Sequence, residues 1–473
     1  ESMLTGEPIP VEKGIGAEVV TGTINKTGSF LFQAKRIGKD TALAQIIDMV
    51  RTAQSSKPAI GRLADKVASV FVPSVLIIAV ISFVIWFNFG PVDQALSLAI
   101  VTTMTVLIIA CPCALGLATP ISIMVGVGKA AEFGTLIRNG DALQQAGKLT
   151  TIVLDKTGTV TEGKPSVVEF FAADEFTEEE VLTIALSVES SSEHPLAQAI
   201  VDYAKSKGAK KKLVSAFRAI PGQGIDATVE GQRVLIGNIR LMIENSIDGG
   251  WLGRKSAELV IKAQTPMFIA IGNEIAGLIS VSDAIKPDSK AAIARMHKLG
   301  LRVALLTGDN EVTARAVAKQ VGIDEVIAEV LPEAKEGEIA RLQGLGHIVG
   351  MVGDGINDAP ALARADVGFA IGTGTDVAIE SADITLMRGS LNGVVDAINI
   401  SNATVRNIKQ NLFGAFFYNS LGIPVAAGVL YPWLGLAGLL NPMIAGAAMA
   451  LSSVTVVSNA NRLRWFKPNK KQS

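Results

Sequence analysis

The hydrophobic positions of this chain are gathered into four long apolar runs. The first, Val67–Phe87, holds 21 residues without a charge. At about 1.5 Å per helical residue, such a run can cross a bilayer core of about 30 Å. The other three runs are Ala95–Val127, Leu412–Leu430 and Pro442–Ala460. This pattern predicts transmembrane helices.

Basic residues lie on one side of these runs only. The linkers 89–94 and 431–441 contain no Lys or Arg, whereas Lys and Arg residues gather before the first run and after the last. Because cytoplasmic loops are rich in Lys and Arg, both short hairpins are expected outside. The large segment between the second and third runs is then cytosolic. Buried core helices of a large soluble protein are the alternative, and the consistent charge asymmetry argues against it.

Within this cytosolic segment, three short apolar runs each end in a polar turn rich in Gly and Asp. The runs are Thr151–Leu154, Leu301–Leu306 and His347–Val352. Such runs, with helical patterns between them, predict buried parallel strands, and ligands bind at the carboxyl ends of such strands. The turns carry Asp155, Thr307, Asp354 and Asp358. A carboxylate cluster at one sheet edge suits Mg²⁺.

Composition narrows the class of protein. The 43 Lys and Arg residues nearly balance the 44 Asp and Glu residues, which argues against a nucleic-acid binder held by bulk charge. With 49% hydrophobic and 18% charged residues, the chain is neither disordered nor an ordinary soluble enzyme. Its two cysteines exclude a disulfide framework. Since the chain opens at Glu1 without a signal peptide, we expect a fragment that begins inside a domain.

Three motifs in the cytosolic segment resemble the signature set of P-type ATPases. They are DKTGT at Asp155–Thr159, TGDN at Thr307–Asn310 and GDGINDAP at Gly353–Pro360. The resemblance covers essentially the whole chain. It implies transmembrane α-helices plus a cytosolic α/β haloacid-dehalogenase-like phosphorylation domain, with an inserted α+β nucleotide-binding domain and a partial β-rich actuator domain.

The expected domain boundaries follow from this resemblance and from the apolar runs. The membrane parts are residues 53–128, which include a Cys-Pro-Cys metal site, and residues 406–461. The remaining parts are a partial actuator domain at 1–52, the phosphorylation domain at 129–162 and 281–405, the nucleotide-binding domain at 163–280, and a cytosolic tail at 462–473.

The resemblance implies a role for each motif residue. Asp155 is expected to be the nucleophile that takes the γ-phosphoryl group of ATP, which splits one hard hydrolysis into two easier steps. Lys156 follows it, and Thr157 is expected to help hold Mg²⁺ and phosphate. The other implied roles are Mg²⁺ ligands for Asp354 and Asp358, a phosphate-gripping pair for Thr307 and Gly308, and charge neutralisation for Lys335.

Two further stretches resemble other sites of the family. The adenine site of the heavy-metal branch is matched by Glu189, His194, Gly222 and Gly224. The segment Thr5–Glu7 resembles the actuator loop that dephosphorylates the aspartyl-phosphate, with Glu7 positioning the attacking water. Each of these short matches is informative only in combination with the longer motifs.

The second apolar run contains Cys111-Pro112-Cys113. Pro112 cannot donate to the carbonyl four residues earlier, so we expect it to kink the helix and to turn both thiols towards one point. Polar groups at membrane depth are costly and indicate function. Thiolates favour Cu(I), with Zn²⁺ as a competitor. Two small buried side chains beside a kink are the structural alternative.

The last two apolar runs bear on which metal is transported. Tyr418, Asn419, Met449 and Ser453 resemble the Tyr-Asn and Met-x-x-Ser-Ser pattern of copper exporters. The fourth run contains no Asp, Glu or Lys, whereas a Zn²⁺ pump is expected to place a carboxylate there. Asp65, just before the first run, is a candidate for the cytosolic access path of the metal.

We therefore predict ATP-driven export of Cu(I), and of Ag(I), from the cytosol through an aspartyl-phosphate, with ATP and Mg²⁺ as cofactors. The protein is expected in the lipid of a bacterial plasma membrane, with a cytosolic copper-delivery protein as partner and no nucleic acid. The sequence leaves the oligomeric state open. Alternatives are a Zn²⁺/Cd²⁺-transporting ATPase, a membrane-tethered phosphatase without transport, and a metal-binding membrane module without turnover.

Overall fold

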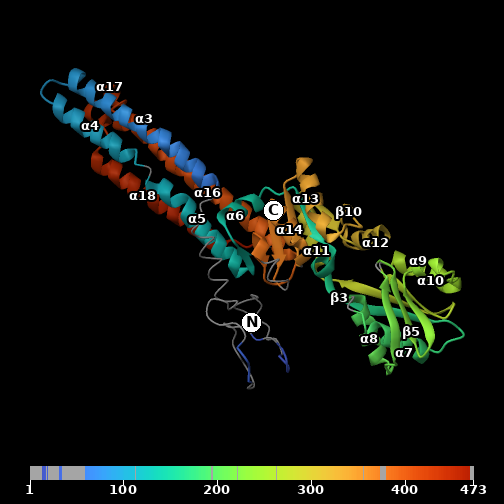
Figure 1. Cartoon of the computed structure of the whole chain (residues 1–473). Coiled ribbons are helices and arrows are strands. Elements are labelled where there is room, and N and C mark those ends of the chain that lie inside the picture. The colour runs from blue at the N-terminus through green and yellow to red at the C-terminus, as the bar shows by residue number, and fades with distance from the viewer. Residues whose placement is uncertain are drawn as a thin grey trace. The chain divides into compact units, whose positions relative to one another are not determined.

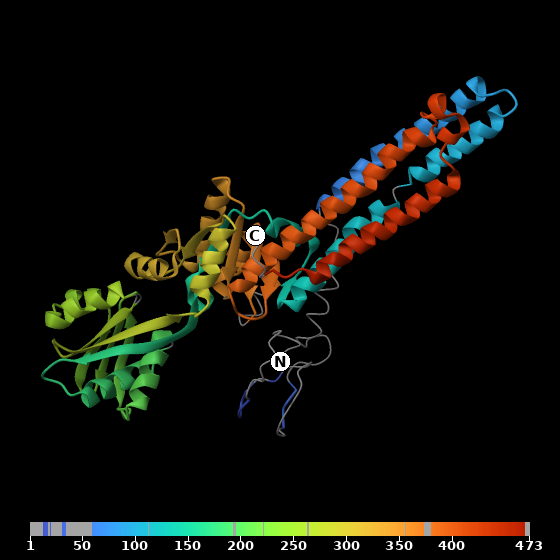
Figure 2. The same cartoon turned by 180° about the vertical axis from the view of Figure 1, so that it is seen from behind.

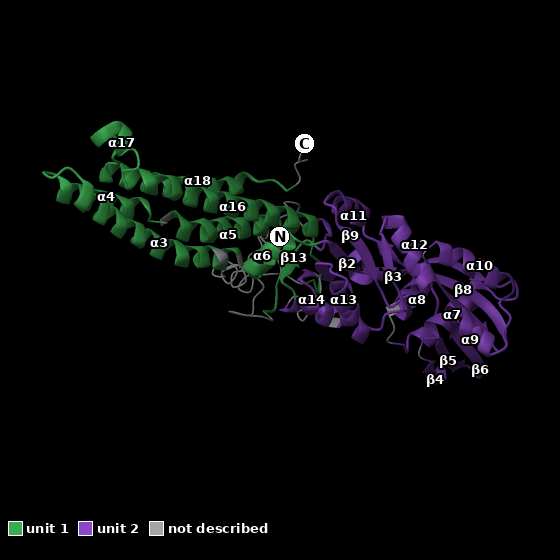
Figure 3. Cartoon of the chain, turned by 90° about the horizontal axis from the view of Figure 1, so that it is seen from above, with its two compact units in different colours: residues 1–149, 382–388, 393–473 green, residues 150–381, 389–392 purple. Residues whose placement is uncertain are grey.

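The computed structural model describes residues 13–17, 19, 31–34, 59–111, 113–192, 195–220, 222–262, 264–354, 356–372 and 380–468. The chain divides into two compact units, coloured green and purple in Figure 3. The first contains residues 1–149, 382–388 and 393–473, and the second contains residues 150–381 and 389–392. The partial actuator domain predicted at 1–52 lies almost wholly outside the described residues.

The first unit is built on long helices that lie side by side in both Figure 1 and Figure 2. They are α3 (Ala59–Phe89), α4 (Ala95–Ile109), α5 (Cys113–Glu132), α16 (Asn392–Ala426) and α18 (Pro442–Asn461). The unit also holds α6 (Gly140–Ala146), α17 (Tyr431–Leu434) and the antiparallel pair β1 (Thr135–Ile137) and β13 (Ile384–Leu386). Among the described residues, three helical stretches are long and apolar enough to cross a membrane, and a bent pair makes a fourth.

Two of the predicted membrane segments differ in detail from the structure. The run Ala95–Val127 is not one kinked helix, because α4 ends at Ile109 and α5 begins at Cys113. The run Leu412–Leu430 covers only the last part of α16, which begins at Asn392 and ends at Ala426, and the chain then bends by 56° into residues 431–438. Apolar composition marks the part of a helix inside lipid, but not where the helix begins.

The interior of this helix bundle is made of small and medium apolar side chains. Val75 and Ala79 of α3, Val106 of α4 and Ala445 of α18 belong to one buried cluster. Gly422 of α16 lies so close to α4 that an added Cβ would come within 2.5 Å of Ile109. Small residues of this kind allow close helix contact, which drives helix association in lipid.

The second unit contains a sheet of parallel strands in the order β12-β11-β2-β9-β10. The strands are β2 (Thr151–Asp155), β9 (Arg302–Leu306), β10 (Glu325–Ile327), β11 (Val349–Gly353) and β12 (Val367–Ile371). The helices of this part are α11 (Ser289–Lys298), α12 (Glu311–Val321), α13 (Lys335–Gly344) and α14 (Ala359–Arg364). The three predicted strands are confirmed, and they are direct neighbours in the sheet.

A second, antiparallel sheet lies in the same unit, in the order β3-β8-β7-β6-β5-β4. Its strands are β3 (Thr161–Ala172), β4 (Val214–Ile220), β5 (Gly224–Val229), β6 (Gln232–Gly237), β7 (Thr265–Ile271) and β8 (Glu274–Ile285). Its helices are α7 (Glu178–Glu189), α8 (Pro195–Ser206), α9 (Ile239–Glu244) and α10 (Gly250–Ile261). The strand β3 precedes the helical pair α7 and α8 in the sequence, and the other five strands follow that pair.

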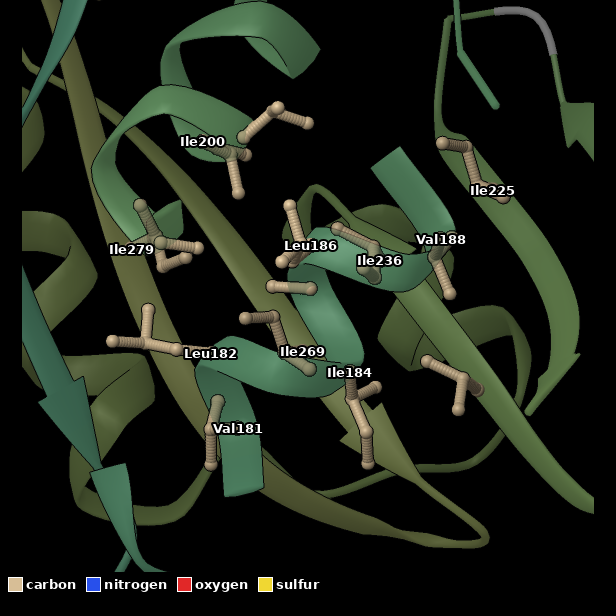
Figure 4. Packing of buried hydrophobic residues seen from close by; sticks show 14 of the residues in the cluster. Val181, Leu182, Ile184, Leu186, Val188, Ile200, Ile225, Ile236, Ile269 and Ile279 are labelled. Atoms are coloured by element: carbon tan, nitrogen blue, oxygen red, sulfur yellow. The ribbon is translucent and has the colours of Figure 1, made fainter. Parts of the chain in front are cut away.

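The core beside this second sheet is large and apolar. Figure 4 shows Leu182 and Leu186 of α7 together with Ile200 of α8, Ile236 of β6 and Ile269 of β7. The apolar face of α7 thus meets side chains from strands far away in the sequence. This packing fixes the end of α7, where Glu189 lies.

Candidate functional site

The carboxyl ends of the parallel strands bring the predicted site residues together. Asp155 is the last residue of β2, and its register partner in β9 is Leu306, which directly precedes Thr307. On the other side of β2, β11 ends at Gly353, directly before Asp354. Side chains from three separate segments therefore meet at one sheet edge.

Asp155, Asp354 and Asp358 form a compact carboxylate cluster at this edge. One oxygen of each lies within 4.8 Å of the others. The Lys335 ammonium, at the start of α13, donates to Asp155 Oδ1 at 2.6 Å and to Asp358 Oδ1 at 2.7 Å. Asp155, Asp358 and Lys335 are all buried. A single lysine therefore faces two buried carboxylates, and the cluster keeps an excess of negative charge.

The charge of this cluster alters its titration. The pKa of Asp155 is raised to about 7, mainly by burial and then by the neighbouring Asp358, against the lowering effect of Lys335. Burial and Asp358 also raise the pKa of Asp354. Crowded carboxylates with raised pKa values gain from a nearby divalent cation, since the cation offsets their repulsion. The donor set, carboxylate oxygens at an open sheet edge, fits Mg²⁺.

The loop after Asp155 has a conformation that requires glycine. Gly158 has a φ of +71°, and a Cβ at this position would lie 1.7 Å from Asp354 Oδ2. Thr157, in contrast, is exposed at the same loop. The backbone of this loop can approach the carboxylate cluster only because no side chain stands between them.

A second ion pair joins this loop to the turn after β9. Lys156 Nζ donates to Asp309 Oδ2 at 2.6 Å, and the Asp309 backbone N–H donates to Thr307 Oγ1 at 3.1 Å. Thr307 is buried and Gly308 is exposed. Asp309 was not among the predicted site residues. It belongs to the TGDN motif, so its place in that motif was the signal that could have found it.

The predicted adenine site is described only in part. Glu189 is 2% exposed, its Oε1 has no hydrogen-bond partner among the described residues, and burial raises its pKa to about 7. Gly224, at the start of β5, comes so close to β6 that a Cβ would lie 2.1 Å from the Ile236 carbonyl oxygen. Gly222 lies in the preceding turn with positive φ, and His194 lies outside the described residues. An unpartnered buried carboxyl fits a site that takes up a polar ligand.

Two predicted metal residues of the first unit, Asn419 and Met449, lie close to Ala110 at the end of α4. Asn419 of α16 is buried, and its Nδ2 donates to the Ala110 carbonyl oxygen at 3.4 Å. Met449 of α18 packs in the same buried cluster as Ala110. Cys111 is exposed and disulfide-bonded, so binding of a metal by its thiolate requires the reduced form. The Cys113 side chain and Pro112 lie outside the described residues.

The structure separates some predicted residues from these clusters. Tyr418 is 54% exposed, on a different face of α16 from its buried neighbour Asn419. The Ser453 hydroxyl donates within its own helix, to the Met449 carbonyl oxygen at 3.3 Å. Asp65 is exposed on α3. Glu7 lies outside the described residues.

Two protein families match separate parts of the chain. Residues 149–366 match the haloacid dehalogenase-like hydrolases, and residues 1–51 match the P-type ATPase actuator domain. The first match contains the parallel strands that end at the carboxylate cluster. The two matches together account for a phosphorylation domain and part of an actuator domain.

Whole proteins also match over nearly the full chain. The chain is 53% identical to "Copper-transporting ATPase 2" of Rhizobium meliloti and to the "Copper-exporting P-type ATPase" of Vibrio cholerae, covering 99% of this chain in each case, and 56% and 51% of those relatives. It is 50% identical to the "Silver exporting P-type ATPase" of Salmonella typhimurium, over 99% of this chain and 57% of that relative. The chain thus spans about half the length of the curated relatives it matches.

A solved structure gives the same family at lower identity. The crystal structure of a zinc-transporting PIB-type ATPase in its E2.Pi state is 34% identical, with a TM-score of 0.71, over 98% of this chain and 74% of that chain. The shared fold extends over both units, and the motifs of the catalytic edge lie within it. The chain therefore belongs to the heavy-metal-transporting P-type ATPases.

Proposed function

We propose that the complete protein exports Cu(I), and also Ag(I), from the cytosol at the expense of ATP. The observation that carries the proposal is the cluster of Asp155, Asp354 and Asp358 around Lys335. It lies in a chain that also contains apolar helices interrupted at Cys111. A sheet edge suited to phosphoryl transfer and a helix break that carries a cysteine, both in one chain, are what a phosphorylation-driven metal pump needs.

The first chemical step is phosphorylation of Asp155. A carboxylate oxygen of Asp155 attacks the γ-phosphorus of ATP, the bond to the β-phosphate oxygen breaks, and ADP leaves. Lys335 neutralises charge at the nucleophile, and Lys156 is held beside it by Asp309. Asp354 and Asp358 would hold Mg²⁺, whose positive charge would offset the negative charge of the transferred group. Thr157, Thr307 and Gly308 would donate hydrogen bonds to that group.

The cycle closes when water hydrolyses the aspartyl-phosphate. Glu7, at the actuator loop, would orient this water and take up its proton, while inorganic phosphate leaves Asp155 as a free carboxylate. ATP would be positioned by the second sheet, where Glu189 Oε1, which has no hydrogen-bond partner among the described residues, supports a polar contact with the adenine. His194 would contact the base, and Gly222 and Gly224 would allow its close approach.

Softness of the ligands favours Cu(I) as the transported ion. The reduced thiolates of Cys111 and Cys113, with the thioether of Met449, are soft donors. Tyr418, Asn419 and Ser453 would complete the path, and Asp65 would lie on its cytosolic side. The described part of α18 contains no acidic side chain that would balance a second positive charge. Relatives named as copper and silver exporters support the same assignment.

Energetics explain why transport must be coupled to ATP. Moving one positive charge outward against 100 mV, inside negative, costs about 2.3 kcal/mol. Each tenfold concentration step adds about 1.4 kcal/mol. A passive path would therefore let the cation flow inward. The protein would work in the lipid of a bacterial membrane and receive its metal from a cytosolic copper-delivery protein.

The test is ATP hydrolysis by the full-length protein in lipid vesicles with reductant, in the presence of Cu(I), Ag(I) or Zn²⁺. Stimulation by Cu(I) and Ag(I) that is lost in Cys111→Ser supports the proposal. Thr455→Ala, a lipid-side change on α18, is the matched control and should keep the stimulation. Stimulation by Zn²⁺ alone would identify a zinc pump. Metal-independent turnover unaffected by Cys111→Ser would indicate a phosphatase.

A further inference from the structure

Lys286 occupies a position that neither the motifs nor the proposed chemistry uses. It follows the end of β8 directly and is half-buried in the second unit. Its Nζ donates to the Gly158 carbonyl oxygen at 2.5 Å and to the Gly389 carbonyl oxygen at 3.0 Å. One ammonium group therefore connects two backbone segments that are more than two hundred residues apart in the sequence.

The first of these segments is the loop after the nucleophile. Gly158 lies three residues after Asp155, and its positive φ places its backbone against Asp354. The neighbouring Val160 carbonyl is held by the same part of the chain, since it accepts from the Lys286 backbone N–H at 3.1 Å and from Ser289 Oγ at 2.8 Å. Lys286 therefore follows any movement of this catalytic loop.

The second segment leads into a membrane helix. Gly389 lies three residues before Asn392, where α16 begins. Asp288 accepts from the Ser390 hydroxyl, and also from Asn392 Nδ2 at 3.2 Å. Arg295 Nη1 donates to Asn392 Oδ1 at 2.6 Å. The first residue of α16 is thus fixed to the same short stretch of chain that holds the catalytic loop.

We propose that Lys286 is a positioning residue that couples phosphorylation of Asp155 to the N-terminal end of α16. The proposal rests on the proposed function only in that Asp155 accepts a phosphoryl group, and it is independent of which metal is transported. When the charge at Asp155 changes, the loop carbonyl of Gly158 is displaced, and Lys286 transmits the displacement to Gly389. Since α16 carries Tyr418 and Asn419, this is a direct covalent route towards the helix break.

A residue that couples two sites and a residue that only stabilises the fold make different predictions. If Lys286 only stabilises the fold, its replacement would leave the response of α16 to phosphorylation unchanged in the folded protein. A coupling element changes the size of that response, because both sites bias the same element. The measured quantity must therefore be the response of α16 and not the activity alone.

The experiment is hydrogen exchange on the full-length protein with and without beryllium fluoride, which mimics a phosphoryl group on Asp155. In the wild type we expect changed exchange both in the loop at 156–161 and in residues 390–404. In Lys286→Gln the exchange of the loop at 156–161 should still change with beryllium fluoride. The change in exchange at 390–404 should be smaller than in the wild type by a factor of at least about five, the lower end typical of coupled sites.

Three further variants complete the test. Lys286→Arg keeps a cationic donor and should restore at least half of the response. Lys290→Gln, an exposed lysine on α11, is the matched control and should behave as the wild type. Asp288→Asn weakens the contacts with Ser390 and Asn392 at the start of α16 and leaves the loop unchanged. It should therefore reproduce the Lys286→Gln result even if Lys286→Gln folds poorly.

The outcomes separate this proposal from the proposed function. If the wild-type loop does not respond to beryllium fluoride, phosphoryl acceptance fails and the coupling proposal falls with it. If the loop responds but residues 390–404 do not, only the coupling is overturned. An α16 response that survives in both Lys286→Gln and Asp288→Asn also overturns it.

Discussion

The helix bundle and the second sheet use the same apolar residues in opposite places. In α3, Ile77 is 61% exposed while the small Ala79 is buried. In the second sheet, Ile269 of β7 is fully buried inside a cluster of large side chains (Figure 4). A large apolar side chain gains from leaving water, but it gains nothing from leaving lipid. The contrast between Ile77 and Ile269 therefore illustrates how the surrounding solvent affects where a large apolar side chain is stable.

Buried polar groups differ between the same two regions. In the bundle, neutral side chains satisfy one another: Asn411 Nδ2 donates to Asn407 Oδ1 and to Ser122 Oγ, each at 3.2 Å, and Asn459 Nδ2 donates to Asn411 Oδ1 at 2.8 Å. At the catalytic edge, charged groups are buried together around Lys335. Neutral amides suit helix packing, whereas a buried net charge needs a function to account for it.

The largest expected effect comes from Asp155, the proposed nucleophile. Asp155→Asn keeps the shape of the side chain but removes the attacking carboxylate, so ATP turnover and transport should fall by a factor of at least about 10³. The measurement is phosphoenzyme formation from radiolabelled ATP. Asp324→Asn, an exposed aspartate outside the cluster, is the control. Phosphoenzyme that persists in Asp155→Asn would contradict the role of this residue.

Lys335→Met tests the buried charges. It leaves Asp155 and Asp358 buried without their cation, and removing one partner of a buried ion pair costs about 3–5 kcal/mol. We expect a lower melting temperature without Mg²⁺ and partial recovery with Mg²⁺, which would supply positive charge. The melting temperature in detergent, followed by tryptophan fluorescence, measures both. Loss of stability that Mg²⁺ does not reduce would argue against a cation at this cluster.

A pair of isoleucine variants tests whether burial stabilises a large apolar side chain more in the second sheet than on the lipid-facing side of the helix bundle. Ile269→Ala empties a packed site and should cost about 2–5 kcal/mol of folding free energy. Ile77→Ala removes the same atoms from a lipid-facing position and should cost less than about 1 kcal/mol. Thermal unfolding of both variants in the same lipid measures the difference. Equal losses would mean that α3 packs against protein at Ile77.

Glu189→Gln tests a buried acid outside the catalytic edge. Because the folded pKa is raised to about 7, this residue destabilises the fold as pH rises from about 4.5 through 7. The variant should therefore be more stable than the wild type at pH 8, by up to about 3 kcal/mol, and equal to it near pH 4.5. Melting temperatures across this pH range measure the effect. An unchanged difference at all pH values would show that Glu189 does not titrate.

The smallest effect is expected at the amide network of the bundle. Asn411→Ala removes the side chain that connects α5, α16 and α18, and hydrogen bonds between membrane helices average about 0.6 kcal/mol, with a maximum of about 1.7. We expect a small loss of thermal stability in lipid. Gln410→Ala, an exposed neighbour on the same helix, is the control. A loss of thermal stability as large as that of Lys335→Met would show that the amide network contributes more than ordinary helix packing.

The catalytic edge was predictable because its residues follow strands. Asp155, Thr307 and Asp354 each come directly after an apolar run, and parallel strands place their carboxyl ends along one edge. Asp309 and Lys286 were not found in this way. Their roles depend on which distant backbone or side chain they meet, and no local pattern indicates that Lys286 reaches Gly158 and Gly389.

The membrane part was predictable only in outline. Apolar runs located the helices, since a long run without charge is stable only in lipid or in a large core. They did not show that α16 begins at Asn392, because its first turns mix apolar with polar residues and are stabilised by contacts with other parts of the chain. Nor did they show that Tyr418 and Asn419, adjacent in the sequence, differ in burial.

The sequence by itself therefore determined the class of the protein, its membrane helices and the order of its catalytic motifs. The membrane helices follow from local composition and from the length of the apolar runs, whereas the class of the protein follows from motifs that resemble those of P-type ATPases. Tertiary structure alone decided that Lys335 faces two carboxylates, that Oε1 of Glu189 has no hydrogen-bond partner among the described residues, and that Lys286 binds two distant backbone carbonyls. Such contacts join residues whose distance in the sequence carries no information about their distance in space.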